Sequence, residues 1–127
     1  MRAEIRYISS EDYPRTRTGG AFDPRHAWVI MEVEIGPTGE AGSDIFFFYV
    51  CTIDYLSQEL DLEGARFGRN LIIMKEFSWS GAVAALEKLV SSFEGPDWRT
   101  LATKIGRYGL WEFEDYQDGN NHANGLI

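Results

Sequence analysis

The sequence contains a single cysteine, Cys51, among its 127 residues, so it cannot form an internal disulfide. That composition fits a reducing compartment such as the cytoplasm. The longest apolar run, Ile45 to Cys51, has seven residues, far fewer than the ~20 that a membrane-spanning helix needs. Residues 1–13 lack the apolar core of a secretory signal. We therefore expect a cytoplasmic protein with no membrane partner.

Basic residues are missing from one long segment of the chain. Residues 26–65 contain no Lys or Arg but eight acidic side chains, whereas the remainder carries equal numbers of acids and bases. The net charge of −8 therefore arises from this segment alone. A negative field repels nucleic acid and anionic membranes and attracts basic partners. We expect no binding of nucleic acid, and a basic protein as partner.

Residues for metal, cofactor or nucleophilic chemistry are also scarce. The two histidines, His26 and His122, have no other metal-type ligand at a suitable spacing, and no glycine-rich phosphate loop is present. The best catalytic candidates are Glu32 and Glu34, which alternate along an expected strand and so lie ~7 Å apart on one face. Solvent-facing acids opposite a core stripe explain the same spacing. We expect no catalytic residues, no metal and no cofactor.

The apolar patterning is typical of a single α+β domain with a mainly antiparallel sheet and two or three helices packed on one face. In residues 28–35, Val29, Met31, Val33 and Ile35 point one way, and Trp28, Ile30, Glu32 and Glu34 point the other. Similar patterns predict strands at residues 3–8, 45–51 and 71–75. In the first of these strands, Ala3, Ile5 and Tyr7 are expected on one face. The strand at residues 45–51 is apolar on both faces, so we expect it inside the sheet. Helices are expected to open at Thr52, at Ser80 and at Pro96 or Asp97. The last of them should end at Gly106 and be followed by a short strand or extended arm. The domain is expected to span residues 1–116, with a flexible tail at residues 117–127. Residues 9–26 have no period and predict a long loop that carries three arginines.

Several stretches carry a resemblance to a known family, among them Ala3-Glu-Ile-Arg-Tyr-Ile8, Phe46-Phe-Phe-Tyr-Val-Cys-Thr52 and, most specific, Ile105-Gly-Arg-Tyr-Gly-Leu-Trp-Glu-Phe-Glu-Asp-Tyr116. From Ala3 to Tyr116 the chain resembles the Immunity protein 8 family of bacterial polymorphic toxin systems. It departs from the family pattern at Ile53, where proline is expected, and at Phe93, where cysteine is expected. The resemblance implies a non-catalytic protein that binds and neutralises a toxin domain made by the same cell.

The resemblance and the charge distribution suggest the same kind of partner. Many such toxins are nucleases, whose substrate clefts are basic because they hold phosphates, and an acidic binder suits a basic cleft. The candidate partner-binding residues are therefore the carboxylates Glu32, Glu34, Glu40, Asp44, Asp61, Glu63, Glu112 and Glu114.

The C-terminal stretch quoted above, residues 105–116, is here called the C-terminal motif, and it has two expected roles. Trp111 and Phe113 share one strand face and should cover the core, while Glu112 and Glu114 share the other face and could join Glu32 and Glu34 in one acidic surface. A motif shared across a family favours a framework role, so specificity is expected in the turn at residues 36–44, the loop at residues 60–70 and the arm at residues 9–26.

Two other functions remain open at this stage. An acidic interaction module unrelated to any toxin would have the same charge pattern. A small enzyme that uses Glu32 and Glu34 as its acid and base would also have it. The sequence does not identify the toxin, and it leaves monomer and dimer as alternatives.

Overall fold

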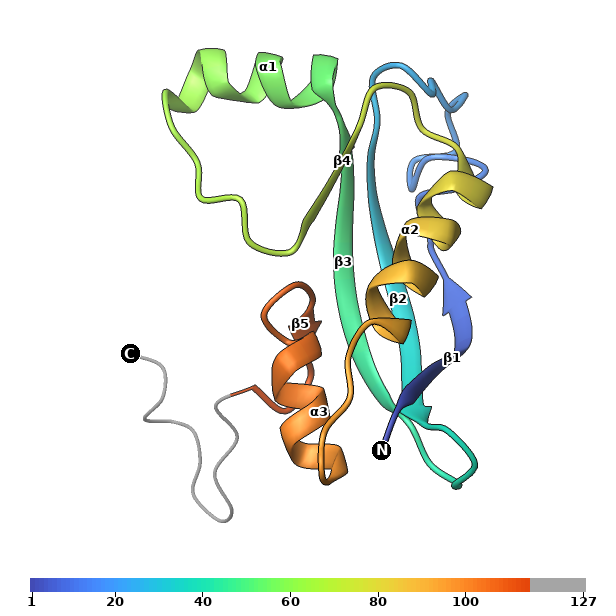
Figure 1. Ribbon diagram of the computed structural model, residues 1–127. Coiled ribbons are helices and arrows are strands. Elements are labelled where there is room, and N and C mark those ends of the chain that lie inside the picture. The colour runs from blue at the N-terminus through green and yellow to red at the C-terminus, as the bar shows by residue number, and fades with distance from the viewer. Residues whose placement is uncertain (115–127) are drawn as a thin grey trace.

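The computed structural model describes residues 1–114, so the expected tail at residues 117–127 lies outside the described part of the chain. It contains a five-stranded sheet in the order β1-β2-β3-β4, with β5 paired to β3 (Figure 1). The strands are β1 (Ala3–Ser9), β2 (Trp28–Pro37), β3 (Asp44–Thr52), β4 (Leu71–Met74) and β5 (Leu110–Trp111). The helices are α1 (Ile53–Glu63), α2 (Trp79–Ser91) and α3 (Trp98–Ile105).

The central strand of the sheet is β3, which pairs with three other strands. It forms an antiparallel hairpin with β2 and an antiparallel pair with β5, whereas its pairing with β4 is parallel. β4 lies beside Tyr49–Thr52 and β5 lies beside Phe46 and Phe47, so the two short strands follow one another along one edge of β3. Parallel neighbours need a crossover connection, and α1 lies within it. The expected α+β fold with a mainly antiparallel sheet is confirmed.

One face of the sheet is buried under α2 and α3. In Figure 1, α2 lies in front of the strands and α3 lies beside the lower part of β3. The alternation expected in β2 is confirmed, because Val29, Met31, Val33 and Ile35 have no accessible surface. They pack in one cluster with Leu86 of α2 and with the buried side of α3. α1 contributes no buried residue and projects from the end of β3 (Figure 1). Two helices therefore cover the sheet, and the third stands at its margin.

Helix ends were predicted well where a single capping side chain decides them. The Thr52 hydroxyl accepts the Tyr55 N–H at the start of α1, and α3 ends at Gly106, both as expected. Of the two residues expected to open α3, Pro96 and Asp97, it is Asp97 that caps the helix. The expected cap at Ser80 is wrong. Ser78 has the extended backbone of an N-cap and accepts the Gly81 N–H at 3.0 Å, so the helix begins two residues earlier than the apolar stripe suggested.

The face expected for β1 is also corrected. The sequence pattern placed Ala3, Ile5 and Tyr7 on one face, but the register with β2 shifts between Ile5 and Tyr7. Such a bulge inserts one unpaired residue and reverses the faces beyond it. Ile8 therefore packs against the core, while Tyr7 lies on the other face with 61% of its surface exposed.

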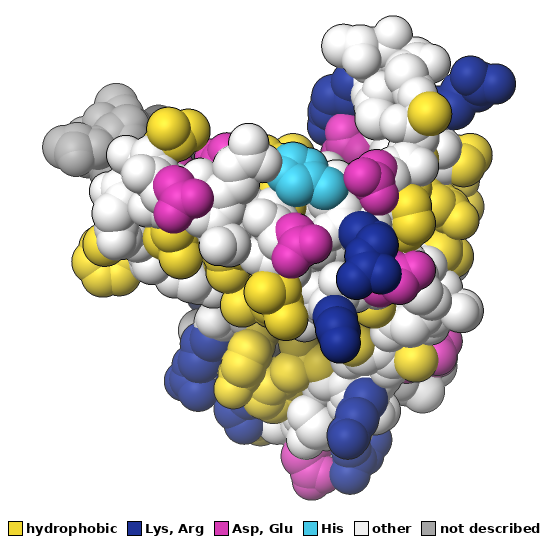
Figure 2. Space-filling view, turned by 90° about the horizontal axis from the view of Figure 1, so that it is seen from above, with side chains coloured by type: hydrophobic (Ala, Val, Ile, Leu, Met, Phe, Trp, Pro, Cys, Tyr) yellow, Lys and Arg dark blue, Asp and Glu magenta, His cyan; other side chains and the backbone are white. Residues whose placement is uncertain are grey.

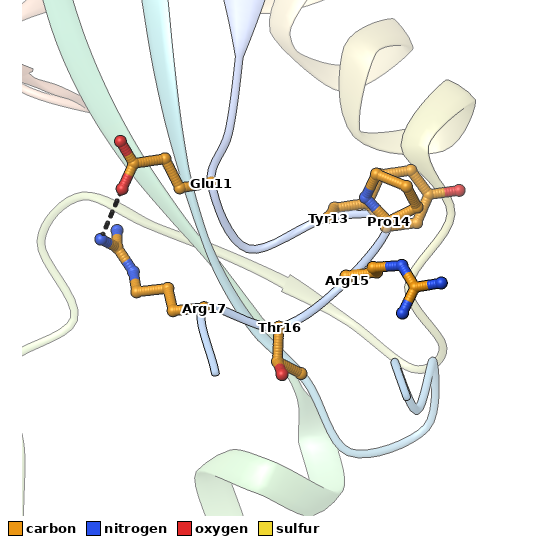
Figure 3. A pocket seen from close by; sticks show the side chains of 6 residues that line it. All are labelled: Glu11, Tyr13, Pro14, Arg15, Thr16 and Arg17. Atoms are coloured by element: carbon orange, nitrogen blue, oxygen red, sulfur yellow. Dashed lines mark hydrogen bonds and ion pairs between the residues drawn. The ribbon is translucent and has the colours of Figure 1, made fainter. Parts of the chain in front are cut away.

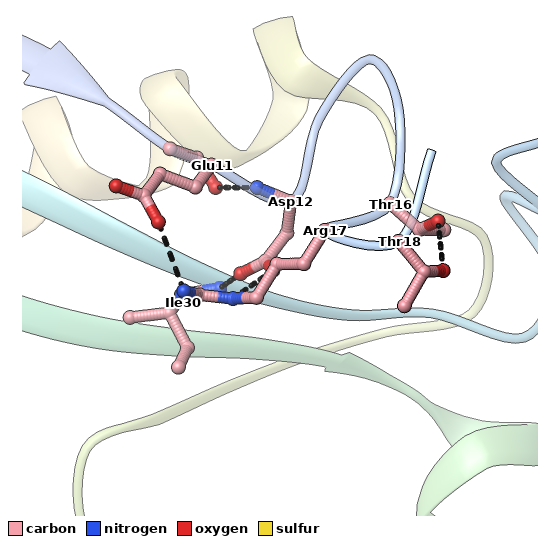
Figure 4. A network of polar contacts seen from close by, with 7 residues as sticks. Glu11, Asp12, Thr16, Arg17, Thr18 and Ile30 are labelled. Carbon is pink, nitrogen blue, oxygen red and sulfur yellow. Dashed lines mark hydrogen bonds and ion pairs between the residues drawn. The ribbon is translucent and has the colours of Figure 1, made fainter. Parts of the chain in front are cut away.

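The loop between β1 and β2 is tied to the body of the protein. The Tyr13 ring lies 5.1 Å from both Phe22 and Phe77. The buried Asp12 carboxylate accepts the Ile30 N–H at 2.8 Å and the Arg17 Nε–H at 2.7 Å (Figure 4). Asp12 therefore supplies the acceptor for a backbone N–H of β2 beyond the end of β1, where no strand pairs with it. Arg17 is held by Asp12 within the loop.

Arg17 also pairs with Glu11, at the rim of a hollow of about 340 Å³ in the same loop (Figure 3). This hollow is lined by loop residues alone.

Helices α1–α3 have 11, 13 and 8 residues, and none of the helices within residues 1–114 is long and apolar enough to cross a bilayer.

Candidate functional site

The face of the sheet opposite α2 and α3, here called the open face, is the candidate site. Strand register assigns it Tyr7 and Ser9 from β1, Trp28, Ile30, Glu32 and Glu34 from β2, Ile45, Phe47, Tyr49 and Cys51 from β3, Leu71 and Ile73 from β4, and Leu110 from β5. None of its apolar side chains belongs to the core cluster under the helices. Extended apolar surfaces of this kind in soluble proteins commonly mark interaction sites.

Two carboxylates lie side by side within this apolar surface. Glu32 lies between Ser9 and Phe47, and Glu34 lies between Tyr7 and Ile45 on the neighbouring strands. Both are partly exposed. Within residues 1–114, Glu34 accepts one long hydrogen bond from Ser43 Oγ at 3.4 Å, Glu32 accepts none, and no Lys or Arg pairs with either. The open face therefore holds two negative charges without a positive partner among the described residues.

The α1 end of the open face is walled by aromatic rings and one arginine. The Trp28 ring lies 5.5 Å from Tyr49 and 5.6 Å from Tyr55 of α1. The Arg66 guanidinium lies 5.2 Å above the Trp28 ring. A hollow of about 320 Å³ opens beside Trp28 and Tyr55 and extends to His26. The open-face ring of Trp28 thus forms part of the wall of this hollow, and the loop between β1 and β2 forms most of the remainder.

The segment from α1 to β4 flanks the open face. α1 carries four carboxylates and no basic residue, and of its acids Glu63 pairs with Arg66 at 3.6 Å. Leu62 and Phe67 are 82% and 98% exposed. Seen from the α1 end, acidic side chains are interspersed with hydrophobic ones rather than gathered in one continuous patch (Figure 2). The negative charge of the 26–65 segment is therefore spread over several surfaces.

The structure separates the eight predicted partner-binding residues into groups. Glu32 and Glu34 lie on the open face, and Asp61 and Glu63 lie on exposed parts of α1. Glu40 lies in the exposed β2–β3 turn, where its backbone carbonyl accepts from Arg6 at 2.7 Å. The other three carboxylates, Asp44, Glu112 and Glu114, bond to or within the C-terminal part of the described chain.

The hydrogen bonds of these three carboxylates hold the C-terminal motif in place. Asp44 Oδ2 accepts the indole N–H groups of Trp98 and Trp111 at 2.7 and 3.1 Å. Glu112 Oε2 accepts the Ile45 N–H at 2.5 Å. Glu114 forms two hydrogen bonds with the Arg69 guanidinium, one of them at 2.7 Å. These contacts support the expected framework role of the motif.

The expected joining of the acids into one surface stays a prediction. Glu112 follows β5, and its carboxylate accepts the N–H of Ile45, whose partner on the neighbouring strand is Glu34. Glu114 pairs instead with the 64–70 loop, and Asp44 bonds to indoles from α3 and β5. The sequence does not single out the apolar members of the open face, because a strand that is apolar on both faces, such as β3, is expected to lie inside a sheet.

The described residues offer little for catalysis. Cys51 is fully buried, and desolvation raises the pKa of its thiol despite the opposing effect of Arg66. Nowhere in residues 1–114 do three His, Cys, Asp or Glu side chains come together in an arrangement that could hold a metal ion.

Comparison with known proteins gives one family. The model of the Immunity protein 8 family matches residues 3–116, nearly the whole chain. No match is found among curated proteins or among solved structures. The match covers every strand and helix that the structure describes in residues 1–114, and the C-terminal motif. The chain therefore belongs to the Immunity protein 8 family.

Proposed function

We propose that this protein is a stoichiometric, non-catalytic inhibitor that binds a toxin domain produced by the same cell and acts in the cytoplasm. The observation that carries the proposal is the open face, where Glu32 and Glu34 lie unpaired with any described Lys or Arg among half-exposed aromatic and aliphatic side chains. Aromatic residues at the centre of a patch supply most of the affinity in many protein complexes. Family membership supports a toxin as the partner.

The partner we propose is a toxin with a basic substrate cleft, such as a nuclease. Four acids of α1 and the two carboxylates of the open face contribute to a net charge of −8. A cleft that binds phosphates carries positive charge, so an acidic inhibitor is attracted to it and competes with the substrate. Inhibition would follow from occupation of the cleft, with no covalent bond made or broken.

The direct test is protection of cells. The product of the adjacent open reading frame is expressed alone or together with this protein, and growth is measured. We expect growth to be restored by co-expression, and the two purified proteins to form a 1:1 complex that lacks toxin activity. An adjacent product without a toxin domain, or a purified toxin that this protein neither binds nor inhibits, would refute the proposal.

A further inference from the structure

We infer that the open face recognises arginine side chains of the toxin, with Glu32 and Glu34 as the groups that bind the guanidinium. This inference rests on the proposed function and specifies its binding site and its chemistry. The two residues alternate along β2, so their side chains project from the same face ~7 Å apart. That spacing lets two carboxylates share one arginine or receive two.

The surroundings of the two carboxylates favour arginine over lysine. Glu32 is flanked by the Phe47 ring, and Glu34 is flanked by Tyr7 and Ile45. A guanidinium is planar and weakly hydrated, so it can stack on an aromatic ring while it donates two hydrogen bonds to a carboxylate. An ammonium group is strongly hydrated and loses more on entering a partly apolar surface. Within the protein, the Arg66 guanidinium already lies over the ring of Trp28, which belongs to the open face.

Charge also argues against a second copy of this chain as the occupant. A twofold dimer through the open face would bring the same patch of both subunits together, and it would place four carboxylates, Glu32 and Glu34 of each copy, in one interface. Like charges in a partly desolvated interface are destabilising. A basic partner removes this repulsion, because it supplies the positive charges that the described residues do not provide.

The test compares two variants that lose the same charge from different faces. E32Q/E34Q keeps the shape of the open face and removes its charges. E76Q/E87Q removes two exposed charges that lie just before and within α2, and neither residue has an ion pair among the described residues. Affinity for the purified toxin domain of the adjacent open reading frame is measured by calorimetry, and circular dichroism checks that each variant is folded.

We expect the dissociation constant of E32Q/E34Q to rise about tenfold or more, and that of E76Q/E87Q to stay within about twofold. Treatment of the toxin domain with phenylglyoxal, which blocks arginine, should abolish binding, whereas acetylation of its lysines should leave most of it. If E32Q/E34Q binds as tightly as the wild type and still protects cells, the inference fails and the proposed function stands. If the wild type itself neither binds nor protects, the proposed function fails and the inference with it. A dimer formed through the open face would also overturn the inference.

Discussion

The Trp111 indole donates its Nε1 hydrogen to Asp44 Oδ2 at 3.1 Å, which links the last strand to the first residue of β3. Trp98, the first residue of α3, donates to the same oxygen at 2.7 Å. The Trp111 ring also stacks on the buried Phe46, with 6.3 Å between ring centroids. One carboxylate therefore joins α3, β3 and β5, and part of the acidic charge serves the fold rather than a partner.

Removal of this carboxylate should destabilise the protein. Asp44→Ala leaves two partly buried indole N–H groups without their acceptor, and we expect a loss of about 2–4 kcal/mol in the free energy of unfolding. Asp44→Asn keeps one oxygen acceptor and should lose less than half as much. Urea unfolding followed by tryptophan fluorescence measures both. Equal losses in the two variants would show that the indole bonds contribute little.

Gly109 in the C-terminal motif should not tolerate a side chain. A Cβ atom built on Gly109 would lie 2.3 Å from Cζ of Phe48, whose ring is buried against the backbone at this point. We expect Gly109→Ala to lower the free energy of unfolding by about 1–3 kcal/mol through overpacking. Gly68→Ala is the matched control, because its Cβ would have its nearest neighbour at 4.0 Å. A variant at position 109 as stable as the one at position 68 would contradict this packing.

The sequence predicted best the features that depend on neighbouring residues. The alternation of β2 and the caps at Thr52 and Asp97 depend on side chains close in the chain, and the structure has them as expected. The cap of α2 was misplaced because Ser78 and Ser80 are chemically equivalent candidates two residues apart. Only the extended backbone at Ser78 distinguishes them.

Features that depend on distant partners could not be predicted. The bulge at Arg6 requires the partner strand and the acceptors Pro37 O and Glu40 O at 2.6 and 2.7 Å. The engagement of Asp44 with Trp98 and Trp111 joins residues 54 and 67 positions apart. For the same reason, the pattern of β3 could not show which of its two apolar faces the helices cover.

Cys51 should be unreactive while the protein is folded. Its side chain has no accessible surface, and desolvation raises the pKa of its thiol, so little reactive thiolate is present. We expect iodoacetamide to label native protein about a hundredfold or more slowly than protein in urea. Mass spectrometry of timed samples measures the ratio. Rapid labelling of the native protein would mean that this end of β3 opens readily.

Asp97 should contribute a pH-dependent part of the stability. The Thr100 N–H, at 2.8 Å, holds the pKa of the Asp97 carboxyl below its ordinary value of 3.8. The ionised group therefore stabilises the fold above 3.8, and this contribution disappears as the pH falls through the lower, folded-state pKa. Asp97→Asn keeps a neutral cap and should flatten that part of the acid unfolding curve. An unchanged curve in the variant would contradict the assignment.

Association with a basic toxin should depend on salt through its rate. Screening shortens the reach of exposed charges from ~10 Å at 0.1 M to ~3 Å at 1 M salt, so long-range attraction fades before contact is made. We expect the association rate constant, measured by stopped flow with the purified toxin domain, to fall several-fold over that range, while the dissociation rate changes much less.

The α1 variant Asp61→Asn, which removes a charge with no ion pair among residues 1–114, should lower the association rate and its salt dependence without altering dissociation. E32Q/E34Q should chiefly speed dissociation, since its carboxylates act after contact. An association rate that is flat with salt would exclude electrostatic steering, and the affinity would then rest on the contacts of the open face alone.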